Sequence, residues 1–396
     1  APDARLVVEM TTVGIECSML WREARQANDF ARLEPKLTKV FELVKELGAV
    51  TGEAMGVNSY DALIDRFEPG MTASRVDTIF APLRAELPDL IGEVLEKQAA
   101  WVPIELPPGP FEPEMQRQIG MSFMKALGFD FEHGRLDTSH HPFCGGVPED
   151  VRITTRYDEK DFTSALMGVL HETGHALYER QLPAEWSALP IGKARGMGIH
   201  ESQSLFVEMQ ICRSGAFVDW AAPQLKSHFG GTGPTWDVEN LKKVYRQVKR
   251  SLIRVDADEV TYPCHVILRF ELEQALISGD LRVCDLPGAW NEKMEKLLGV
   301  RPDTDTMGCM QDIHWMDGAV GYFPSYTLGA LFAAQLFDAA EADIGGLDEK
   351  FREGEFAPVV GWLGEKIHSQ GSRWGTDDLV ERATGAPLSA EPFLDH

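Results

Sequence analysis

The chain has 396 residues, of which 44% are hydrophobic and 25% are charged, an ordinary composition for a large globular protein. It contains 38 Lys and Arg against 62 Asp and Glu, so its formal net charge is −24 at pH 7. This charge argues against nucleic acid or an anionic membrane surface as a partner. No apolar run approaches the length of a membrane-spanning helix, and no basic-then-apolar leader stands at the N-terminus.

The first hundred residues predict helix after helix. Apolar residues recur at three- and four-residue spacing in 7–20 and 37–47, and a third such run covers 73–95. A proline-rich break at 103–113 follows, and then a short helix is predicted over 115–127. Residues 1–101 contain no candidate catalytic constellation, so we interpret them as a helical wall.

The pattern changes after residue 139. His140 and His141 stand in a stretch with Gly and Pro that reads, on the residues alone, as an ordinary polar loop. Residues 151–157 alternate and are rich in β-branched side chains, which predicts a strand. We expect a small β-sheet edge near residues 150–157, against which an extended peptide could lie.

Residues 171–175 read His-Glu-x-x-His within a predicted apolar helix. Residues four apart lie on one helix face, so His171 and His175 can each give a nitrogen to one zinc ion. Glu172 is rotated by about 100° around the helix and can serve as a general base there. Asp161 is the expected N-cap of this helix, and Pro183 is its expected stop.

A catalytic zinc site needs a third protein ligand and an open fourth position. Glu201 follows His175 by 26 residues and opens a second predicted helix, which makes it one candidate. Glu208 is the competitor further along the same helix. Either carboxylate could instead be a solvated surface charge.

Polar residues within apolar surroundings recur downstream. Arg254 lies in the apolar stripe of a long helix predicted over 241–258, where a charge is usually paired or functional. A purely structural role would pair it with Asp258, four residues on. The Gly-rich segment 308–326 suits a substrate-lining loop. It contains three candidate functional residues: Gln311, His314 and Tyr326.

The six cysteines show no pairing pattern, because none forms a C-x-x-C pair and their spacing suggests no disulfide framework. Isolated thiols in a chain of this size are typical of a reducing compartment. We therefore expect a cytoplasmic protein without a thiolate zinc site.

Six short motifs stand in order between residues 141 and 315. They are His141-Pro142-Phe143, Asp150-x-Arg152-x-Thr154, His171-Glu172-x-x-His175, His200-Glu201-Ser202-Gln203, Ile253-Arg254-x-x-Ala257-Asp258 and Gly308-x-x-Gln311-Asp312-x-His314-Trp315. Only the histidine pair is specific alone, but all six in this order are highly specific. The chain thereby resembles the carboxypeptidase Taq family of zinc metallocarboxypeptidases.

The resemblance implies a mostly α-helical zinc-peptidase fold with a deep active-site groove and a single catalytic domain over 1–396. Within it we expect helical walls over 1–101 and 331–396, with the zinc site and substrate groove in 102–330. It also implies release of single amino acids from peptide C-termini with broad side-chain tolerance, and a homodimer. Members of this family usually begin with a further helical segment, which we expect to be absent here because the sequence starts at Ala1.

Carried over by position, the resemblance implies three zinc ligands: His171, His175 and Glu201. Glu172 becomes the general base, and cobalt could replace the zinc. Arg254 becomes the anchor of the substrate's terminal carboxylate, with Arg152 as the competitor. His314 or Tyr326 would stabilise the oxyanion. Two further residues are assigned to substrate binding: His141 and Gln311.

Two alternatives accompany this interpretation. An endopeptidase or dipeptidase would use the same zinc chemistry, and the presence or absence of a carboxylate anchor separates it. A non-catalytic helical protein with a structural zinc would usually supply a fourth protein ligand, whereas this sequence offers three. We expect peptides with a free C-terminus as substrates and neither nucleic acid nor membrane as a partner.

Overall fold

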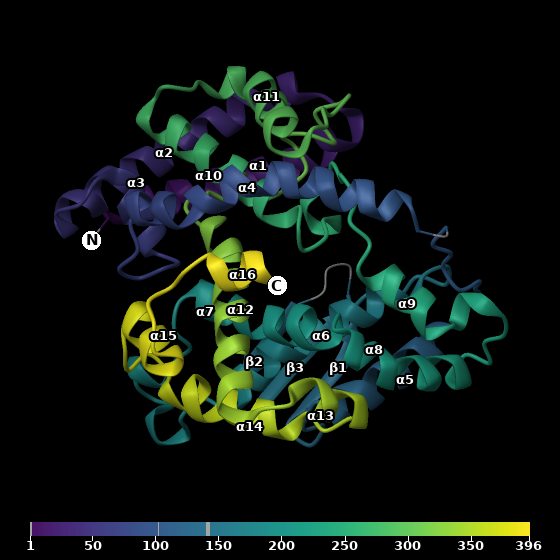
Figure 1. The fold of residues 1–396 in the computed structure, drawn as a ribbon. Coiled ribbons are helices and arrows are strands. Elements are labelled where there is room, and N and C mark those ends of the chain that lie inside the picture. The colour runs from purple at the N-terminus through teal and green to yellow at the C-terminus, as the bar shows by residue number, and fades with distance from the viewer. Residues whose placement is uncertain (1, 102, 140–142) are drawn as a thin grey trace. The chain divides into compact units, whose positions relative to one another are not determined.

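The computed structural model describes residues 2–101, 103–139 and 143–396. Figure 1 shows a chain built mainly of helices with one small sheet, which confirms the predicted fold class. In the part of the chain that the structure describes, no helix is long and apolar enough to cross a membrane.

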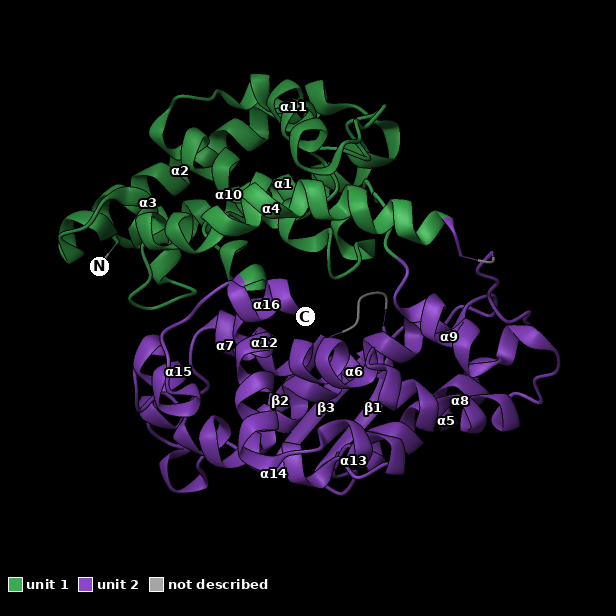
Figure 2. Cartoon of the chain, in the orientation of Figure 1, with its two compact units in different colours: residues 1–99, 248–327 green, residues 100–247, 328–396 purple. Residues whose placement is uncertain are grey.

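The chain forms two compact units, coloured separately in Figure 2. Unit 1 comprises residues 1–99 and 248–327, and unit 2 comprises residues 100–247 and 328–396. Each unit therefore contains two separate stretches of sequence. The expected division into one catalytic domain with two helical walls stays a prediction.

The described residues of unit 1 are helices and their connections. Its elements are α1 (Ala4–Ala27), α2 (Phe30–Met55), α3 (Ser59–Asp65), α4 (Ala73–Ala99), the 3₁₀ turns η5 (Arg254–Asp256) and η6 (Val283–Asp285), α10 (Tyr262–Ser278) and α11 (Leu286–Leu298). The three apolar runs predicted in the first hundred residues lie inside α1, α2 and α4. In α2, Leu33, Leu37, Val40, Val44 and Leu47 are buried at three- and four-residue spacing, as an amphipathic helix requires.

The long helix predicted over 241–258 is wrong, because α9 (Val238–Tyr245) ends early and no α-helix resumes before α10. The carboxylate of Asp258 accepts the backbone N–H groups of Lys249, Val260 and Thr261, and such local bonds compete with helix formation. Pro263 stands in the first turn of α10, where its missing N–H has no cost.

Unit 2 contains the sheet and the remaining helices. Its helices are α5 (Pro113–Ala126), α6 (Phe162–Arg180), α7 (Met197–Leu205), the π-helix η3 (Phe206–Cys212), α8 (Gly215–His228), α9, most of α12 (Pro324–Ile344), α13 (Leu347–Glu353), α14 (Ala357–Lys366), α15 (Thr376–Thr384) and α16 (Glu391–Asp395). Its 3₁₀ turns are η1 (Ala184–Trp186), η2 (Pro190–Gly192), η4 (Pro234–Trp236) and η7 (His368–Gln370).

The sheet has three strands, β1 (Gly134–Thr138), β2 (Phe143–Val147) and β3 (Asp150–Thr155), in the order β1-β3-β2. β3 runs parallel to β1, with Gly134 opposite Val151, and antiparallel to β2. The predicted strand is therefore confirmed as β3, but its predicted position at the sheet edge is wrong. The edges are β1 and β2, because the short connection after β2 returns the chain as a hairpin.

The sheet packs against α6 and thereby fixes the rotation of that helix. Val151 and Ile153 of β3 form a buried cluster with Val169 and Ala176 of α6 and Met124 of α5. At 100° per residue, positions 171 and 175 lie about 200–240° around the helix from position 169. The packing therefore turns the two histidines of α6 away from the sheet.

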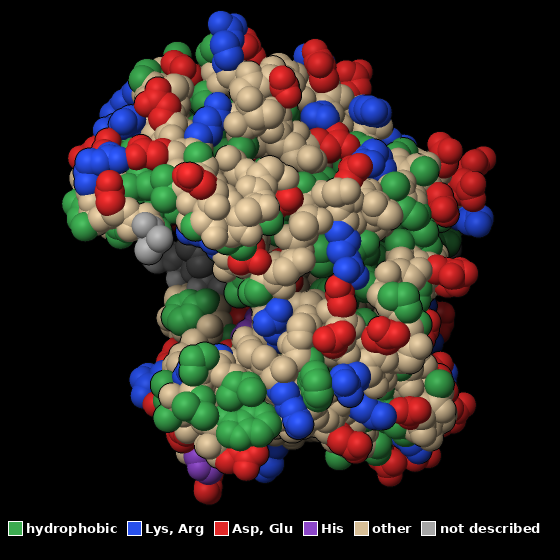
Figure 3. Space-filling model, turned by 90° about the vertical axis from the view of Figure 1, so that its left-hand side faces the viewer, with side chains coloured by type: hydrophobic (Ala, Val, Ile, Leu, Met, Phe, Trp, Pro, Cys, Tyr) green, Lys and Arg blue, Asp and Glu red, His purple; other side chains and the backbone are tan. Residues whose placement is uncertain are grey.

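Acidic and basic side chains are mixed on the face that Figure 3 shows. On this face the acidic side chains are interspersed with basic ones and are not gathered in one acidic patch. The charge excess therefore does not by itself mark a binding surface there.

Candidate active site

Helix α6 carries the two histidines of the His-Glu-x-x-His motif. Its N-cap is Asp161, whose carboxylate accepts the N–H of Thr163 at 2.8 Å, and the helix ends at Arg180, shortly before Pro183. Both predicted boundary signals are thus confirmed. The imidazole rings of His171 and His175 lie on one face with their centroids 5.0 Å apart.

Helix α7 reaches the histidines because α6 has no side chain at Gly174. A Cβ there would meet the backbone oxygen of Gln203 at 2.3 Å and the Cα of Ser204 at 2.6 Å. Contacts this short with backbone atoms leave room only for glycine. The glycine in the motif therefore sets how closely Glu201 of α7 can approach the histidines.

A second glycine, Gly329 of α12, lies behind Glu201. A Cβ at Gly329 would come within 2.8 Å of the Cβ and Cγ of Glu201 and 3.2 Å of the backbone oxygen of Gly198. Helix α12 therefore packs directly on the stem of the glutamate. Two close helix contacts restrict where the Glu201 carboxylate can lie.

The structure brings together His171, His175 and Glu201. One potential ligand atom from each of the three lies within 4.8 Å of the others. The Oε2 atom of Glu201 is 3.5 Å from Nε2 of His175 and 3.9 Å from Nε2 of His171. These side chains keep 13–21% of their surface exposed, so the three groups are accessible from outside.

The Nδ1 atoms of both histidines contact protein groups on the side of the ring away from Glu201. Nδ1 of His171 is 2.9 Å from Oε2 of Glu208. Nδ1 of His175 is 3.1 Å from the backbone oxygen of His200 and 2.7 Å from Nδ1 of that residue. Nε2 of His200 in turn contacts Oε1 of Glu179 at 2.8 Å. Both Nε2 atoms are therefore left to face Glu201.

Glu208 does not stand on a regular helix. The second helix expected from His200 onward is divided into α7, the π-helix η3 and, after a break, α8. Glu208 lies in η3 with 9% of its surface exposed, and its Oε1 accepts bonds from Nη2 and Nε of Arg213 at 2.8 and 3.3 Å. The competing candidate for third ligand is thus bound to protein groups through both oxygens.

The histidines titrate differently. Burial alone would lower the pKa of His171, but the bond to Glu208 and the charges of Glu201, Glu208 and Glu172 raise it to about 10. Burial lowers the pKa of His175 to about 4, against the opposing bond to Glu201. Protons and metal ions compete for imidazole nitrogens, so a metal that binds Nε2 of His171 must displace the proton that the charged ring carries on that atom.

The carboxylates of the cluster also differ. Burial raises the pKa of Glu172, and the negative charges of Glu201 and Glu208 add to this effect. Burial would raise the pKa of Glu208 as well, but the charge of Arg213 and the bond to His171 lower it to about 2. Glu172 is therefore the carboxylate of the group with the greatest tendency to take up a proton, as a general base near neutral pH requires.

Strand β2 is close to Glu172. The pKa of the Cys144 thiol in β2 is raised to about 12, first by burial and then by the charges of Glu172 and Glu179. Because β2 is an edge strand, its outer backbone groups are candidates for pairing with an extended peptide. The edge expected to serve that purpose is thus β2 rather than β3.

Arg254 belongs to unit 1 and is 5% exposed. Its Nε and Nη2 donate to Oδ1 of Asp312 at 3.2 and 2.9 Å, and its Nη1 donates to the hydroxyl of Tyr262 at 2.8 Å. Oδ2 of Asp312 accepts two more bonds from Arg269. The structural pairing expected with Asp258 is wrong, since the partner is Asp312, 58 residues away in sequence.

His314, Tyr326 and Gln311 also belong to unit 1. Nε2 of His314 is 3.0 Å from the hydroxyl of Tyr326, and burial lowers the pKa of His314 to about 4, so this imidazole is neutral at pH 7. Gln311 accepts the backbone N–H of Arg254 at 2.8 Å and donates to backbone oxygens from 252, 307 and 308. Its side chain therefore shapes the backbone at Arg254.

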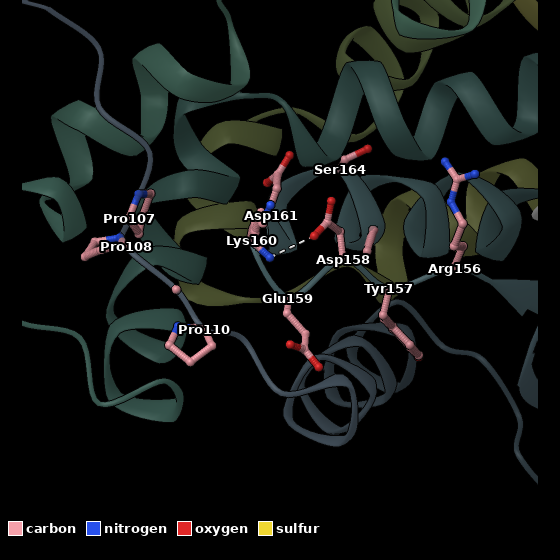
Figure 4. Close-up of a pocket in the computed structure, with 12 residues that line it drawn as sticks. Pro107, Pro108, Pro110, Arg156, Tyr157, Asp158, Glu159, Lys160, Asp161 and Ser164 are labelled. Atoms are coloured by element: carbon pink, nitrogen blue, oxygen red, sulfur yellow. Dashed lines mark hydrogen bonds between the residues drawn. The ribbon is translucent and has the colours of Figure 1, made fainter.

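Arg152 and His141 are the remaining candidates for substrate binding. Arg152 of β3 is exposed and donates to both carboxylate oxygens of its neighbour Asp150. His141 lies outside the described residues. A pocket of about 870 Å³ lies between the segment Pro107–Pro110 and the stretch from Arg156 to Ala165 (Figure 4). None of the predicted ligands is among its described lining residues.

Sequence reasoning missed the partners of the histidines. Glu208 was considered only as a rival ligand, and neither Glu179 nor His200 was assigned a role. Glu179 stands four residues after His175, on the same face of α6, and this spacing was the available signal. The bond between Glu208 and His171 had no comparable signal, because it depends on a π-helix.

Comparison with known proteins assigns the chain to a family. The carboxypeptidase Taq (M32) metallopeptidase family matches residues 1–396. Thermostable carboxypeptidase 1 of Thermus thermophilus is 42% identical over 398 residues, covering 98% of this chain and 78% of that protein. Carboxypeptidase 1 of Bacillus subtilis is 38% identical over 383 residues, covering 95% and 75% respectively.

Solved structures agree with the sequence comparison. Metallocarboxypeptidase 1 of Trypanosoma cruzi superimposes with a TM-score of 0.97 at 43% identity, covering all of this chain and 80% of that one. An M32 carboxypeptidase from Deinococcus radiodurans gives a TM-score of 0.92 at 38% identity, covering all of this chain and 79% of that one. The chain therefore belongs to the carboxypeptidase Taq (M32) family and is a metallocarboxypeptidase.

Proposed function

We propose that the chain is a zinc carboxypeptidase that releases single amino acids from the C-termini of peptides with broad side-chain tolerance. The observation that carries the proposal is the convergence of His171, His175 and Glu201, with Glu172 next to the first histidine. Family membership supports peptides as the substrate class and removes the alternative of a non-catalytic protein. It also favours a carboxypeptidase over an endopeptidase.

The donor set fits zinc. It offers two imidazole nitrogens and one carboxylate oxygen, which is the ligand composition of catalytic zinc sites with an open fourth position. Cobalt, which accepts the same ligand types, is the expected substitute. When bound, such an ion supplies Lewis-acid chemistry that activates a water molecule and polarises the scissile carbonyl.

Glu172 moves the proton in this mechanism. It takes a proton from the attacking water and delivers it to the leaving amine nitrogen. Its 8% exposure and the neighbouring carboxylates favour the protonated form more than in a surface glutamate, so it can both accept and return a proton. Glu201 cannot share this role while it serves as a ligand.

For the oxyanion we propose Tyr326, supported by His314. The Nδ1 atom of His314 is buried without a hydrogen-bond partner among the described residues, so a proton on that atom would be unsatisfied. The imidazole proton is then on Nε2 and is donated to the Tyr326 oxygen. In this arrangement the Tyr326 hydroxyl proton can be donated to a developing negative charge.

Arg254 remains our candidate for the anchor of the terminal carboxylate, because a guanidinium binds a carboxylate through two parallel bonds. Asp312 and Tyr262 already hold this side chain in one orientation, which lowers the entropic cost of binding. Arg152 is the alternative, and its exposed pair with Asp150 offers less preorganisation. The alternative of an endopeptidase or dipeptidase predicts that no such anchor matters.

We further propose a cytoplasmic homodimer. All six cysteines are free of disulfide bonds, as is typical of a reducing compartment. A dimer gains support from the exposed apolar side chains of α1, which can be covered by a second copy. They are Val7, Val8, Ile15 and Met19. Light scattering on the purified chain tests the dimer.

The test of the proposed function combines metal analysis with peptide hydrolysis. The purified chain should contain about one zinc ion and should release the C-terminal amino acid from an N-blocked dipeptide. The same dipeptide with an amidated C-terminus should be a poor substrate. Glu172→Gln should retain zinc and lose turnover by orders of magnitude, whereas the exposed control Glu185→Gln should keep both.

Three results would contradict the proposal. Near-normal turnover in zinc-loaded Glu172→Gln would remove the general base. Equal hydrolysis of the free and amidated dipeptides would indicate an endopeptidase-like site without an anchor. A chain that binds no zinc would exclude the metal site.

A further inference from the structure

We infer that Glu208 is the positioning residue of His171: it holds the imidazole by Nδ1 and so leaves Nε2 as the metal donor. The inference rests on the proposed metal site and adds a residue to it. It explains why a carboxylate that the sequence offers as a rival ligand contacts the far side of the histidine.

The first support is the hydrogen bond itself. Oε2 of Glu208 lies 2.9 Å from Nδ1 of His171, and a carboxylate only accepts hydrogen bonds, so the imidazole proton must be on Nδ1. The neutral ring that binds a metal has one proton, and therefore its lone pair is on Nε2. That atom faces Oε2 of Glu201 at 3.9 Å. The bond to Glu208 thus selects both the tautomer and the direction of the ring.

The second support is that Glu208 is fixed in place. Its Oε1 accepts two bonds from Arg213, and Nη1 of Arg213 donates to the backbone oxygen of Tyr245 at 2.9 Å. Both oxygens of Glu208 are thus engaged with protein groups, which distinguishes it from Glu201. A carboxylate held at both oxygens can restrict the ring that it contacts.

The third support is the local backbone. Glu208 stands in the π-helix Phe206–Cys212, directly after α7. π-helices are rare and frequently occur at functional sites, because the wider turn changes the direction of the side chains that follow. Here the irregular helix brings Glu208 against His171, while the regular helix α7 carries Glu201.

His175 provides an internal contrast. Its Nδ1 faces the backbone oxygen and the ring of His200. The nearest carboxylate on that side belongs to Glu179, which contacts the His200 ring and not His175 itself. Of the two Nδ1 atoms, only that of His171 has an anionic partner in direct contact. Removal of the Glu208 carboxylate should therefore disturb one metal ligand, His171, and weaken metal binding in that way.

The test measures zinc affinity by competition with a chelator. We expect Glu208→Gln and Glu208→Ala to bind one zinc ion with about 10–100-fold lower affinity than the unchanged chain. Glutamine fails because an NH₂ group replaces one of the two oxygens, and this group cannot accept the bond from His171 or from Arg213 that the oxygen accepted. Because Glu208→Gln is isosteric, it decides the question if Glu208→Ala does not fold.

The matched control is Glu273→Gln in unit 1. Glu273 is fully buried and accepts bonds from Tyr60, Trp315 and Gly321, so this variant also replaces a buried, bonded carboxylate by an amide. It should lower the melting temperature without changing zinc affinity. A zinc affinity of Glu208→Gln equal to that of Glu273→Gln would overturn the inference.

A spectroscopic readout separates positioning from general damage. In the cobalt-loaded chain, the Nδ1 proton of each metal-bound imidazole gives a strongly shifted resonance. We expect the His171 proton to exchange slowly with water in the unchanged chain and rapidly in Glu208→Ala, while the His175 proton stays unchanged. Slow exchange of both protons in Glu208→Ala would overturn the inference.

Other outcomes are distinguishable from these. Complete loss of zinc from Glu208→Gln would make Glu208 a ligand rather than a positioning residue, and the inference would be wrong. If the unchanged chain binds no zinc, the proposed function itself fails and the inference fails with it. If the unchanged chain binds zinc and the Glu208 variants bind it with the same affinity, the proposed function stands and only the inference is removed.

Discussion

Each of the two units contains a cluster of buried or half-buried charged side chains, and the clusters are built in opposite ways. In unit 1, both oxygens of Asp312 accept bonds from arginines, two from Arg254 and two from Arg269. In unit 2, His171 and His175 are bonded through Nδ1, while their Nε2 atoms stay 3.9 and 3.5 Å from Glu201. In unit 1 the central carboxylate of Asp312 is fully hydrogen-bonded within the protein, and we call this the closed cluster. In unit 2 the Nε2 atoms of the two histidines and the carboxylate of Glu201 converge on one point, and we call this the open cluster.

The two clusters also differ in the balance of their charges. The unit 1 cluster places two guanidinium groups around one carboxylate, and the unit 2 cluster places three carboxylates, those of Glu172, Glu201 and Glu208, around two imidazoles and one arginine. Buried charge without compensation is costly, so the second arrangement favours a bound cation. The comparison suggests that a closed cluster supports the fold, whereas an open one supports chemistry.

The sharpest test of the open cluster is Glu201→Ala, for which we expect the largest effect. The variant loses the carboxylate that both Nε2 atoms face, leaving two neutral ligands for a divalent ion. Elemental analysis after dialysis should show zinc falling from about one per chain to near zero. Full retention of zinc would shift the third ligand to Glu208 or elsewhere.

The closed cluster predicts a loss of stability when Asp312 is neutralised. Asp312→Asn leaves two buried arginines without their anionic partner, so the free energy of unfolding should fall by about 3–5 kcal/mol. The exposed ion pair of Asp285 with Arg282 offers the control, because Asp285→Asn should leave the denaturation midpoint unchanged. Equal midpoints for Asp312→Asn and the unchanged chain would remove the proposed structural role of the cluster.

This contribution also depends on pH in a defined direction. Burial would raise the pKa of Asp312, but the charges of Arg269 and Arg254 outweigh it and hold the pKa well below its usual range. A carboxylate whose pKa is depressed by folding stabilises the protein above its unfolded pKa of about 4, and this contribution is lost as the pH falls further. The difference in stability between the unchanged chain and Asp312→Asn should therefore shrink below about pH 4.

The variant Arg254→Ala tests whether the closed cluster also binds the substrate. If Arg254 anchors the substrate, kcat/KM on peptides with a free C-terminus should fall by the equivalent of about 2–5 kcal/mol, with little change on the amidated peptides. If Arg254 is purely structural, both substrates should suffer alike and the melting temperature should fall. That second result would move the proposed anchor to Arg152.

The sequence predicted which side chains of the candidate site come together better than it predicted the backbone around them. The histidine pair, its neighbouring base and the N-cap Asp161 follow from local spacing, which is why they could be located. The fold class and most helices followed from apolar periodicity. Motif resemblance selected Glu201 over Glu208, a choice that the residues alone had left open.

The errors have a common physical cause. The helix over 241–258 was predicted from apolar spacing, but the Asp258 side chain bonds to local backbone N–H groups instead. The partner of Arg254 was sought four residues away and lies 58 residues away. The central position of β3 depends on both neighbouring strands. Each of these features is decided by tertiary contacts that spacing along the chain does not encode.

The last prediction concerns the helix contact that keeps Glu201 near the histidines. A Cβ on Gly174 would lie 2.3 Å from a backbone oxygen of α7, and backbone atoms cannot rotate away as a side chain can. Gly174→Ala should therefore push α7 from α6 and lower the free energy of unfolding by about 1–3 kcal/mol.

Gly168 of the same helix is the matched control, because a Cβ there would meet no described atom within 4 Å. Gly168→Ala should be neutral or stabilise the chain by about 0.5–1 kcal/mol through helix propensity. If the contact at Gly174 matters for the open cluster, Gly174→Ala should also weaken zinc binding, since Glu201 moves with α7, while Gly168→Ala should leave zinc affinity unchanged. Equal zinc affinities for the two variants, with only Gly174→Ala destabilised, would mean that the glycine serves packing and that Glu201 reaches the metal without it.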